Sequence, residues 1–204
     1  MTVTYQQTIS TENADGSDFS FTTKTFVDGS PEKEIRGKAR REGDATKVAM
    51  QSPKAAEFSL PLSYFPMQHT ATLIEHAKAG DRIVEAKLFD GDDDAEKLLS
   101  STAIISPNDP PAVPAAPETS KAEGPPPPPR RSPKIDQELA GLKSWKVSES
   151  YYNSDSDPDG MPVFETSYTL YENGVSDALT LNFGEYAFNG ALSQLDLLDA
   201  KGCK

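Results

Sequence analysis

Three aspartates at alternate positions have a spacing that could bind a metal ion. Asp155, Asp157 and Asp159 precede Gly160, and this pattern matches the first half of a calcium loop, where carboxylate oxygens surround a hard cation. The second half departs from the pattern, because position twelve is Thr166 and not a bidentate glutamate. We therefore interpret the segment as a polar turn between strands, with calcium binding by the three aspartates as the alternative.

Two histidines, His69 and His76, lie seven residues apart in a segment that we predict to be helical. This spacing places them on one side of the helix but roughly 10 Å apart along its axis. Zinc binds its nitrogen ligands at about 2.1 Å, so one ion could not bind both rings. We interpret both as flanking or partly buried side chains of the helix.

The signatures of common catalytic sites are missing from the sequence. It contains no GxSxG elbow, no GxGxxG or GxxxxGK loop and no CxxC pair. Paired carboxylates could act as acid and base, but 32 acidic residues among 204 make chance pairs unavoidable. We therefore predict a protein without enzymatic activity or a cofactor, and an unrecognised hydrolase is an alternative.

The charge balance excludes one class of partner. The chain has 20 Lys and Arg against 32 Asp and Glu, a net charge of -12, so its surface repels phosphate groups and we expect no nucleic acid partner. No apolar run reaches the roughly 18 residues that a membrane helix needs, so we expect no membrane-spanning segment. The first ten residues also lack the basic and apolar segments of a secretion signal.

The elements that would position these residues are mostly β-strands. Apolar and polar residues alternate in short segments, and Asp-Gly pairs between the segments mark turns, as is typical of antiparallel meanders. The predicted strands are residues 3–10, 19–27, 34–41, 47–51, 57–60, 82–89, 102–105, 142–152 and 185–198, together with a hairpin at 162–183.

The hairpin is the clearest element, because Asn173-Gly174 favours a two-residue type I′ turn. With these residues at the tip, one face of the hairpin is apolar and the other polar. The pairs expected on the apolar face are Phe164 with Phe183, Thr166 with Leu181, and Tyr168 with Leu179.

One helix is predicted at residues 66–79. Pro66 suits the first helical position and Gly80 suits a left-handed stop. We expect the helix to pack against the concave face of the sheet. Its predicted apolar stripe is Met67, Ala71, Ile74 and Ala77, with Leu73 at the edge.

A Pro-rich segment at 106–134 interrupts the strands. It holds most of the 17 prolines, and such composition favours extended polyproline II structure that packs no core. We predict a loop or linker here. Residues 1–105 and 135–204 would then form one discontinuous domain, since neither part has an obvious second layer to cover its apolar face.

Several stretches together resemble the EipB-like envelope-integrity family of alphaproteobacteria, and the likeness covers nearly everything outside the Pro-rich segment. The resemblance implies a long curved antiparallel sheet, or β-spiral, similar to a partly closed barrel, with one amphipathic helix packed against it. The stretches are FTTKTFVDG at 21–29, FPMQH at 65–69, AKAGD at 77–81, LFDG at 88–91 and YTLYENGV at 168–175.

The resemblance also implies a function. Members are periplasmic, support cell-envelope integrity and have no established catalytic residues, so the expected partner is an envelope protein, peptidoglycan or a lipid component. The alternatives are a carrier of an apolar ligand and an envelope hydrolase. The family carries a disulfide, and Cys203 matches its C-terminal cysteine. Its partner is expected upstream of Met1, together with a signal peptide and the family's first strands, which would make Met1 a misplaced start or an artificial boundary.

The Pro-rich segment supplies a first test. Replacing residues 108–131 with a short Gly/Ser connector should leave the free energy of unfolding nearly unchanged, because closure entropy varies by only about 0.6 kcal/mol per doubling of loop length. Urea denaturation of both proteins measures this. Separate melting of the parts on either side would contradict the assignment of one domain.

Overall fold

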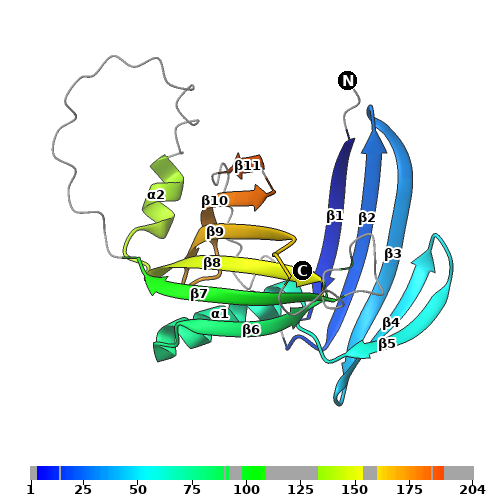
Figure 1. Ribbon diagram of the computed structural model, residues 1–204, viewed down its shortest axis with the longest axis horizontal. Helices are drawn as coiled ribbons and strands as arrows, with labels where there is room; N and C mark the ends of the chain where they lie inside the picture. The colour runs from blue at the N-terminus through cyan, green and yellow to red at the C-terminus, as the bar shows by residue number, and fades with distance from the viewer. Residues whose placement is uncertain are drawn as a thin grey trace.

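The computed structural model describes residues 4–13, 15–89, 91, 98–108, 133–153, 160–184 and 186–190. These residues are mainly β, as predicted, with two helices (Figure 1). The first part contains β1 (Thr4–Glu12), β2 (Asp18–Val27), β3 (Ser30–Glu42), β4 (Ala45–Ser52), β5 (Ala56–Pro61) and α1 (Pro66–Ala79). The second contains β6 (Ile83–Leu88), β7 (Leu99–Pro107), α2 (Pro133–Leu139), β8 (Ser144–Asn153), β9 (Phe164–Tyr171), β10 (Ser176–Phe183) and β11 (Tyr186–Asn189).

The strands form two antiparallel sheets, each in chain order, with β1–β5 in the first and β6–β11 in the second. The strands of one sheet run across the direction of the other (Figure 1). One long curved sheet was expected, and this part of the prediction is wrong because α1 separates β5 from β6. A parallel bridge joins the sheets, where Tyr64 N donates to Lys87 O at 2.8 Å and Phe89 N donates to Tyr64 O at 3.0 Å.

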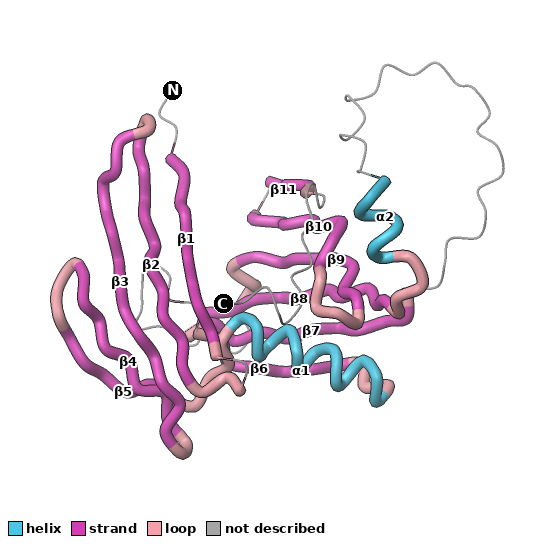
Figure 2. Tube along the Cα trace, turned by 180° about the vertical axis from the view of Figure 1, so that it is seen from behind, coloured by secondary structure: helices cyan, strands magenta, loops and turns pink. Residues whose placement is uncertain are grey.

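The helix α1 has the predicted bounds, and its buried face is rotated from the predicted stripe: Ile74 and Ala77 are buried as expected, but Leu73 and His69 are buried with them in place of Met67 and Ala71. Figure 2 shows it lying along β6 and β7 on one face of the second sheet. Leu73, Ile74 and Ala77 are buried, whereas Met67 is 64% exposed and Ala71 is exposed. Burying Leu73 removes more apolar area from water than burying Ala71 would. The core under the helix adds Val84, Ala103, Ile105, Trp145, Val147 and Leu170.

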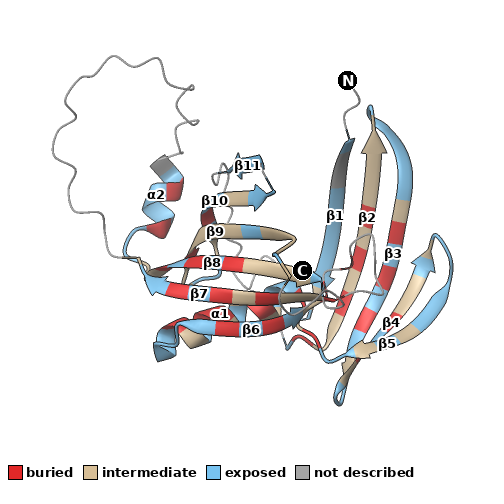
Figure 3. Cartoon of the chain, viewed as in Figure 1, coloured by how far each residue is buried: buried red, intermediate tan, exposed pale blue. Residues whose placement is uncertain are grey.

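A second core of aromatic rings joins the two sheets. Phe65 stacks on Phe19 of β2 with ring centroids 5.1 Å apart, and it meets Phe89 edge-on at 6.3 Å. Gly91 lies against the ring of Phe21, so close that a Cβ atom would be 2.4 Å from it. Gly91 also has a φ of 74°, so both the close approach and the left-handed backbone favour a glycine at this position. Figure 3 shows buried segments on the middle strands of both sheets.

The hairpin of β9 and β10 has a longer turn than predicted. Tyr171 N donates to Val175 O at 2.8 Å, which leaves three residues in the loop, and Gly174 has a φ of 86°. Such a loop, with a glycine in the left-handed region, is the common three-residue alternative to a type I′ turn.

Next to the turn, the pairing of β9 with β10 is shifted by one residue from the predicted pairs. A bulge at Ala178 restores the predicted pairing farther along the strands. Ala178 has a φ of 54° and lies at the irregularity between Asp177 and Thr180. Beyond the bulge Thr166 pairs with Leu181, as predicted, while the expected pair of Tyr168 and Leu179 is lost. The apolar face is only partly covered: Leu179 is 43% exposed and Phe183 is 53% exposed.

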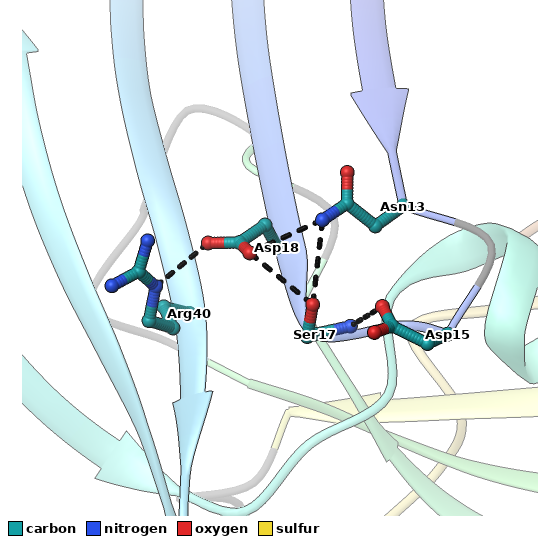
Figure 4. Close-up of polar contacts among 5 residues, drawn as sticks. All are labelled: Asn13, Asp15, Ser17, Asp18 and Arg40. Atoms are coloured by element: carbon teal, nitrogen blue, oxygen red, sulfur yellow. Dashed lines mark hydrogen bonds and ion pairs between the residues drawn. The ribbon is translucent and has the colours of Figure 1, made fainter.

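The turn between β1 and β2 is held by a polar network (Figure 4). Arg40 Nε donates to Asp18 Oδ1 at 2.7 Å, and the Asn13 amide donates to Asp18 Oδ2 at 3.2 Å. Ser17 N donates to Asp15 Oδ1 at 3.0 Å. The Arg40 guanidinium holds the pKa of Asp18 below its usual range. The network joins the β1–β2 turn to β3, which carries Arg40.

Glu12, the last residue of β1, caps the helix. Its carboxylate accepts hydrogen bonds from Met67 N and Gln68 N, both at 2.8 Å. A carboxylate at a helix N-terminus satisfies free amides and complements the helix dipole. The first sheet is thereby joined to α1 as well as to the second sheet.

Strands from both sides of the Pro-rich segment lie next to each other. β7 and β8 pair along nine residues. In the short helix α2, Ile135 and Leu139 are buried. Residues 109–132 lie outside the described residues, as does the part of the predicted last strand beyond Gly190. The single discontinuous domain stays a prediction.

The aromatic core predicts a large difference between two phenylalanines. Phe65→Ala should lower the free energy of unfolding by about 3–5 kcal/mol, because Phe65 is fully buried between the sheets. The control Phe183→Ala, at an exposed ring, should cost about 1 kcal/mol or less. Urea unfolding measures both, and equal losses would contradict the role of this core.

Candidate functional site

A buried carboxylate lies between α1 and the second sheet. Glu149 of β8 is 1% exposed. Its Oε1 lies 2.6 Å from His69 Nε2 of α1 and accepts a short hydrogen bond from Ser101 Oγ of β7. Its Oε2 accepts a hydrogen bond from the Tyr168 hydroxyl of β9 at 2.8 Å. These four side chains, the Glu149 cluster, come from one helix and three adjacent strands.

The cluster keeps Glu149 ionised. Burial raises the pKa of the carboxyl, but the hydrogen bond and charge of His69, with the hydroxyls of Ser101 and Tyr168, outweigh it and hold the pKa below the ordinary 4.5. Burial and the neighbouring carboxylate raise the pKa of Tyr168, so its hydroxyl stays protonated and donates. A carboxylate only accepts hydrogen bonds, so His69 Nε2 carries a proton toward it. Glu149 thus fixes the orientation of the His69 ring.

A pocket of about 430 Å³ opens beside the cluster, between the first turn of α1 and strands β8 to β10. His69, Glu149 and Tyr168 form its polar side. The Tyr151 and Phe164 rings stack with centroids 4.3 Å apart. The larger apolar and aromatic side chains on its other walls are Leu88, Phe89, Leu99, Tyr151, Phe164 and Leu179.

Two polar atoms of residues that line this pocket have no hydrogen-bond partner within the described part of the chain. One is His69 Nδ1, the ring nitrogen that does not bond to Glu149. The other is Thr166 Oγ1 of β9. Both are buried atoms. Buried polar groups in native proteins are nearly always hydrogen-bonded, because an unmade bond costs about 1–3 kcal/mol.

The sequence model that represents the EipB-like family matches residues 1–199 of this chain. The chain belongs to the EipB-like family. A relative in Brucella abortus (strain 2308), called cell envelope integrity protein EipB, is 34% identical over 197 residues. The match covers 97% of this chain and 64% of the relative, so the chain spans less than two thirds of that protein.

A solved structure has the same fold as this EipB-like chain. It is described as a β-barrel-like protein of a domain of unknown function from Brucella abortus, with a TM-score of 0.77 and 30% sequence identity. The match covers 97% of this chain and 75% of the solved chain. The resemblance inferred from the sequence motifs is therefore confirmed. Among the helices that the structure describes, none is long and apolar enough to cross a membrane.

The order of groups in the Glu149 cluster differs from that of a serine hydrolase. There, histidine lies between the serine and the acid and takes the serine proton. In this EipB-like chain, Ser101 and His69 both bind Oε1 of Glu149, which lies between them. Ser101 is 2% exposed and does not line the pocket. The cluster is arranged to hold a ring in place.

The structure separates the two histidines. His69 is 6% exposed, more buried than expected, and belongs to the pocket. His76 is partly exposed, and its Nδ1 lies 2.8 Å from Asp81 Oδ2 at the other end of α1. In the described residues, no group of three or more His, Cys, Asp or Glu side chains gathers as metal ligands.

The other residues singled out from the sequence lie outside the described residues. These are Asp155, Asp157 and Asp159 of the proposed calcium loop, and Cys203. Cys203 is the one cysteine of the chain, so these 204 residues contain no partner for the disulfide that the family resemblance implied.

Sequence reasoning missed three members of the cluster, Ser101, Glu149 and Tyr168. A signal was present in β8, where Trp145, Val147 and Glu149 occupy the same side of an alternating strand. A charged residue on the inward side of a strand indicates a buried, partnered group. Nothing local identified its partners, of which His69 is 80 residues away.

The cluster predicts a pH dependence. Because the folded-state pKa of Glu149 lies below 4.5, its stabilising contribution is present above the unfolded-state pKa and is lost as the pH falls through the folded-state pKa. Glu149→Gln should lower the free energy of unfolding by about 1–3 kcal/mol at neutral pH. The difference from wild type should shrink below pH 4.5. Urea unfolding across this range measures it, and a constant difference would contradict an ionised Glu149.

Proposed function

We propose that this EipB-like protein acts in the periplasm and supports cell-envelope integrity by binding an envelope component or partner protein, without catalysing a reaction. The observation that carries the proposal is the match of 97% of the chain, at 34% identity, to a protein named for envelope integrity. Because the chain spans 64% of that relative, the role is proposed for the whole encoded protein.

Binding is favoured over catalysis by the chemistry of the pocket. Its walls are largely apolar, and its one carboxylate already accepts hydrogen bonds from three protein side chains. A general acid or base needs a proton that it can exchange with a substrate. Glu149 is instead committed to His69, Ser101 and Tyr168, so a hydrolase is the weaker alternative.

A carrier of an apolar molecule is the second candidate. The specific observation in its favour is the pocket of about 430 Å³ between α1 and β8 to β10. This volume falls in the range of small-molecule sites, which are concave and mostly apolar with a few polar groups. Among the partners expected from the family, a lipid component fits this pocket better than peptidoglycan, whose sugars and charged peptides are polar.

Gene disruption in the host organism tests the proposed role. Loss of the protein should lower the plating efficiency on detergent and on large antibiotics, because an impaired envelope admits both. The whole protein fused to a cleavable export signal should restore resistance. The matched control is the same protein retained in the cytoplasm, which should not restore it. Unchanged sensitivity after disruption, or rescue from the cytoplasm, would contradict the proposal.

A further inference from the structure

We infer that the pocket between α1 and β8 to β10 binds an apolar molecule that carries one neutral hydroxyl or amide group, with that group bonded to His69 Nδ1 and Thr166 Oγ1. The inference rests on the proposed function as an envelope-binding protein and names the class of ligand. It follows from the walls of the pocket, the unpartnered polar atoms and the charge of the site.

The side chains on the walls of the pocket favour a ligand that is mostly apolar. Leu88 ends β6, Phe89 follows it and Leu99 begins β7, while Tyr151, Phe164 and Leu179 come from β8, β9 and β10. Leu179 is 43% exposed at the rim. A ligand that covered these side chains would remove their apolar area from water, which favours binding.

The two unpartnered atoms, His69 Nδ1 and Thr166 Oγ1, favour a ligand with one polar group that can both donate and accept a hydrogen bond. His69 Nδ1 accepts a hydrogen bond when the ring is neutral and donates one when the ring is protonated, because Nε2 is directed to Glu149. The Thr166 hydroxyl both donates and accepts. A hydroxyl or amide also does both, so it satisfies each atom in either state of the ring. The bond to Glu149 leaves Nδ1 as the ring nitrogen without a protein partner, and a ligand group that reached this buried atom would supply one.

The charge of the site disfavours ionic ligands. No Lys or Arg lines the pocket among the described residues, and any positive charge on His69 is balanced by Glu149. An anionic group would enter an apolar site without a free cation. A cationic group would find the Glu149 oxygens already bonded to three donors. Burying an uncompensated charge costs far more than burying a hydroxyl.

Competition between three ligands of equal chain length tests the inference. The purified protein is loaded with the fluorescent apolar dye N-phenyl-1-naphthylamine and titrated at pH 7 with decanol, decanoate or decylammonium. Decanol should displace the dye at a concentration at least about tenfold lower than either ion, because only the ions carry an uncompensated charge into the pocket.

Two pairs of variants locate the binding. Thr166→Val removes the hydroxyl at nearly constant shape and should weaken decanol about two- to tenfold. Thr169→Val, on the same strand but not lining the pocket, should leave decanol unchanged. Leu179→Glu should abolish dye binding, whereas Leu62→Glu, at a leucine of similar exposure outside the pocket, should not. Thermal melting confirms that each variant is folded.

The outcomes separate this inference from the proposed function. Equal competition by decanol and the ions, or decanol binding that Thr166→Val leaves unchanged, overturns the ligand class. Dye binding that survives Leu179→Glu, or a wild type that binds no dye, overturns the pocket as the site. Either result leaves the envelope role standing if gene disruption still impairs the envelope. Binding without an envelope defect contradicts the proposed function instead.

Discussion

A buried carboxylate imposes the strongest constraint on this structure. An ionised side chain that is 1% exposed is tolerated only if hydrogen-bond donors surround it. Glu149 obtains its donors from α1, β7 and β9, so helix and strands must keep one relative position for all three bonds to form at once. This places His69 on the buried face of α1 together with Leu73, Ile74 and Ala77, while Met67 and Ala71 of the predicted stripe stay exposed. The same bonds hold the His69 ring beside the pocket.

The first sheet depends on the position of α1. Phe65, just before the helix, packs against Phe19 in the aromatic core, and the amides of Met67 and Gln68 bond to Glu12. The first sheet also contacts the residues that follow β6, where Phe21 packs against Phe89. A parallel bridge at Tyr64 continues the hydrogen bonding into the second sheet. The residues just before and within the first turn of the helix therefore connect both sheets, and they lie next to the pocket, which Pro66 and His69 line.

This arrangement gives the pocket one side backed by buried side chains and one more exposed side. The cluster and the aromatic core support the walls nearest to α1. The opposite rim is formed by β10, where a bulge at Ala178 interrupts the pairing and Leu179 is partly exposed. A binding site with a fixed polar group and an apolar rim suits ligands whose common feature is one polar group rather than a defined overall shape.

Local signals in the sequence determined much of the secondary structure, and only the tertiary structure decided how it was assembled. Pro66 and Gly80 bounded the helix correctly, because proline at the first position and glycine at the stop act through the backbone of their own residues. Alternation located most strands, and the family motifs identified the family. The division into two sheets, the buried face of α1 and the three-residue turn at Gly174 depended on packing and register between segments that no local pattern specifies. The Glu149 cluster also depended on the tertiary structure. Its hydrogen bonds join His69, Ser101 and Tyr168 to Glu149 across long stretches of the chain, and they form only when the helix and strands have packed together.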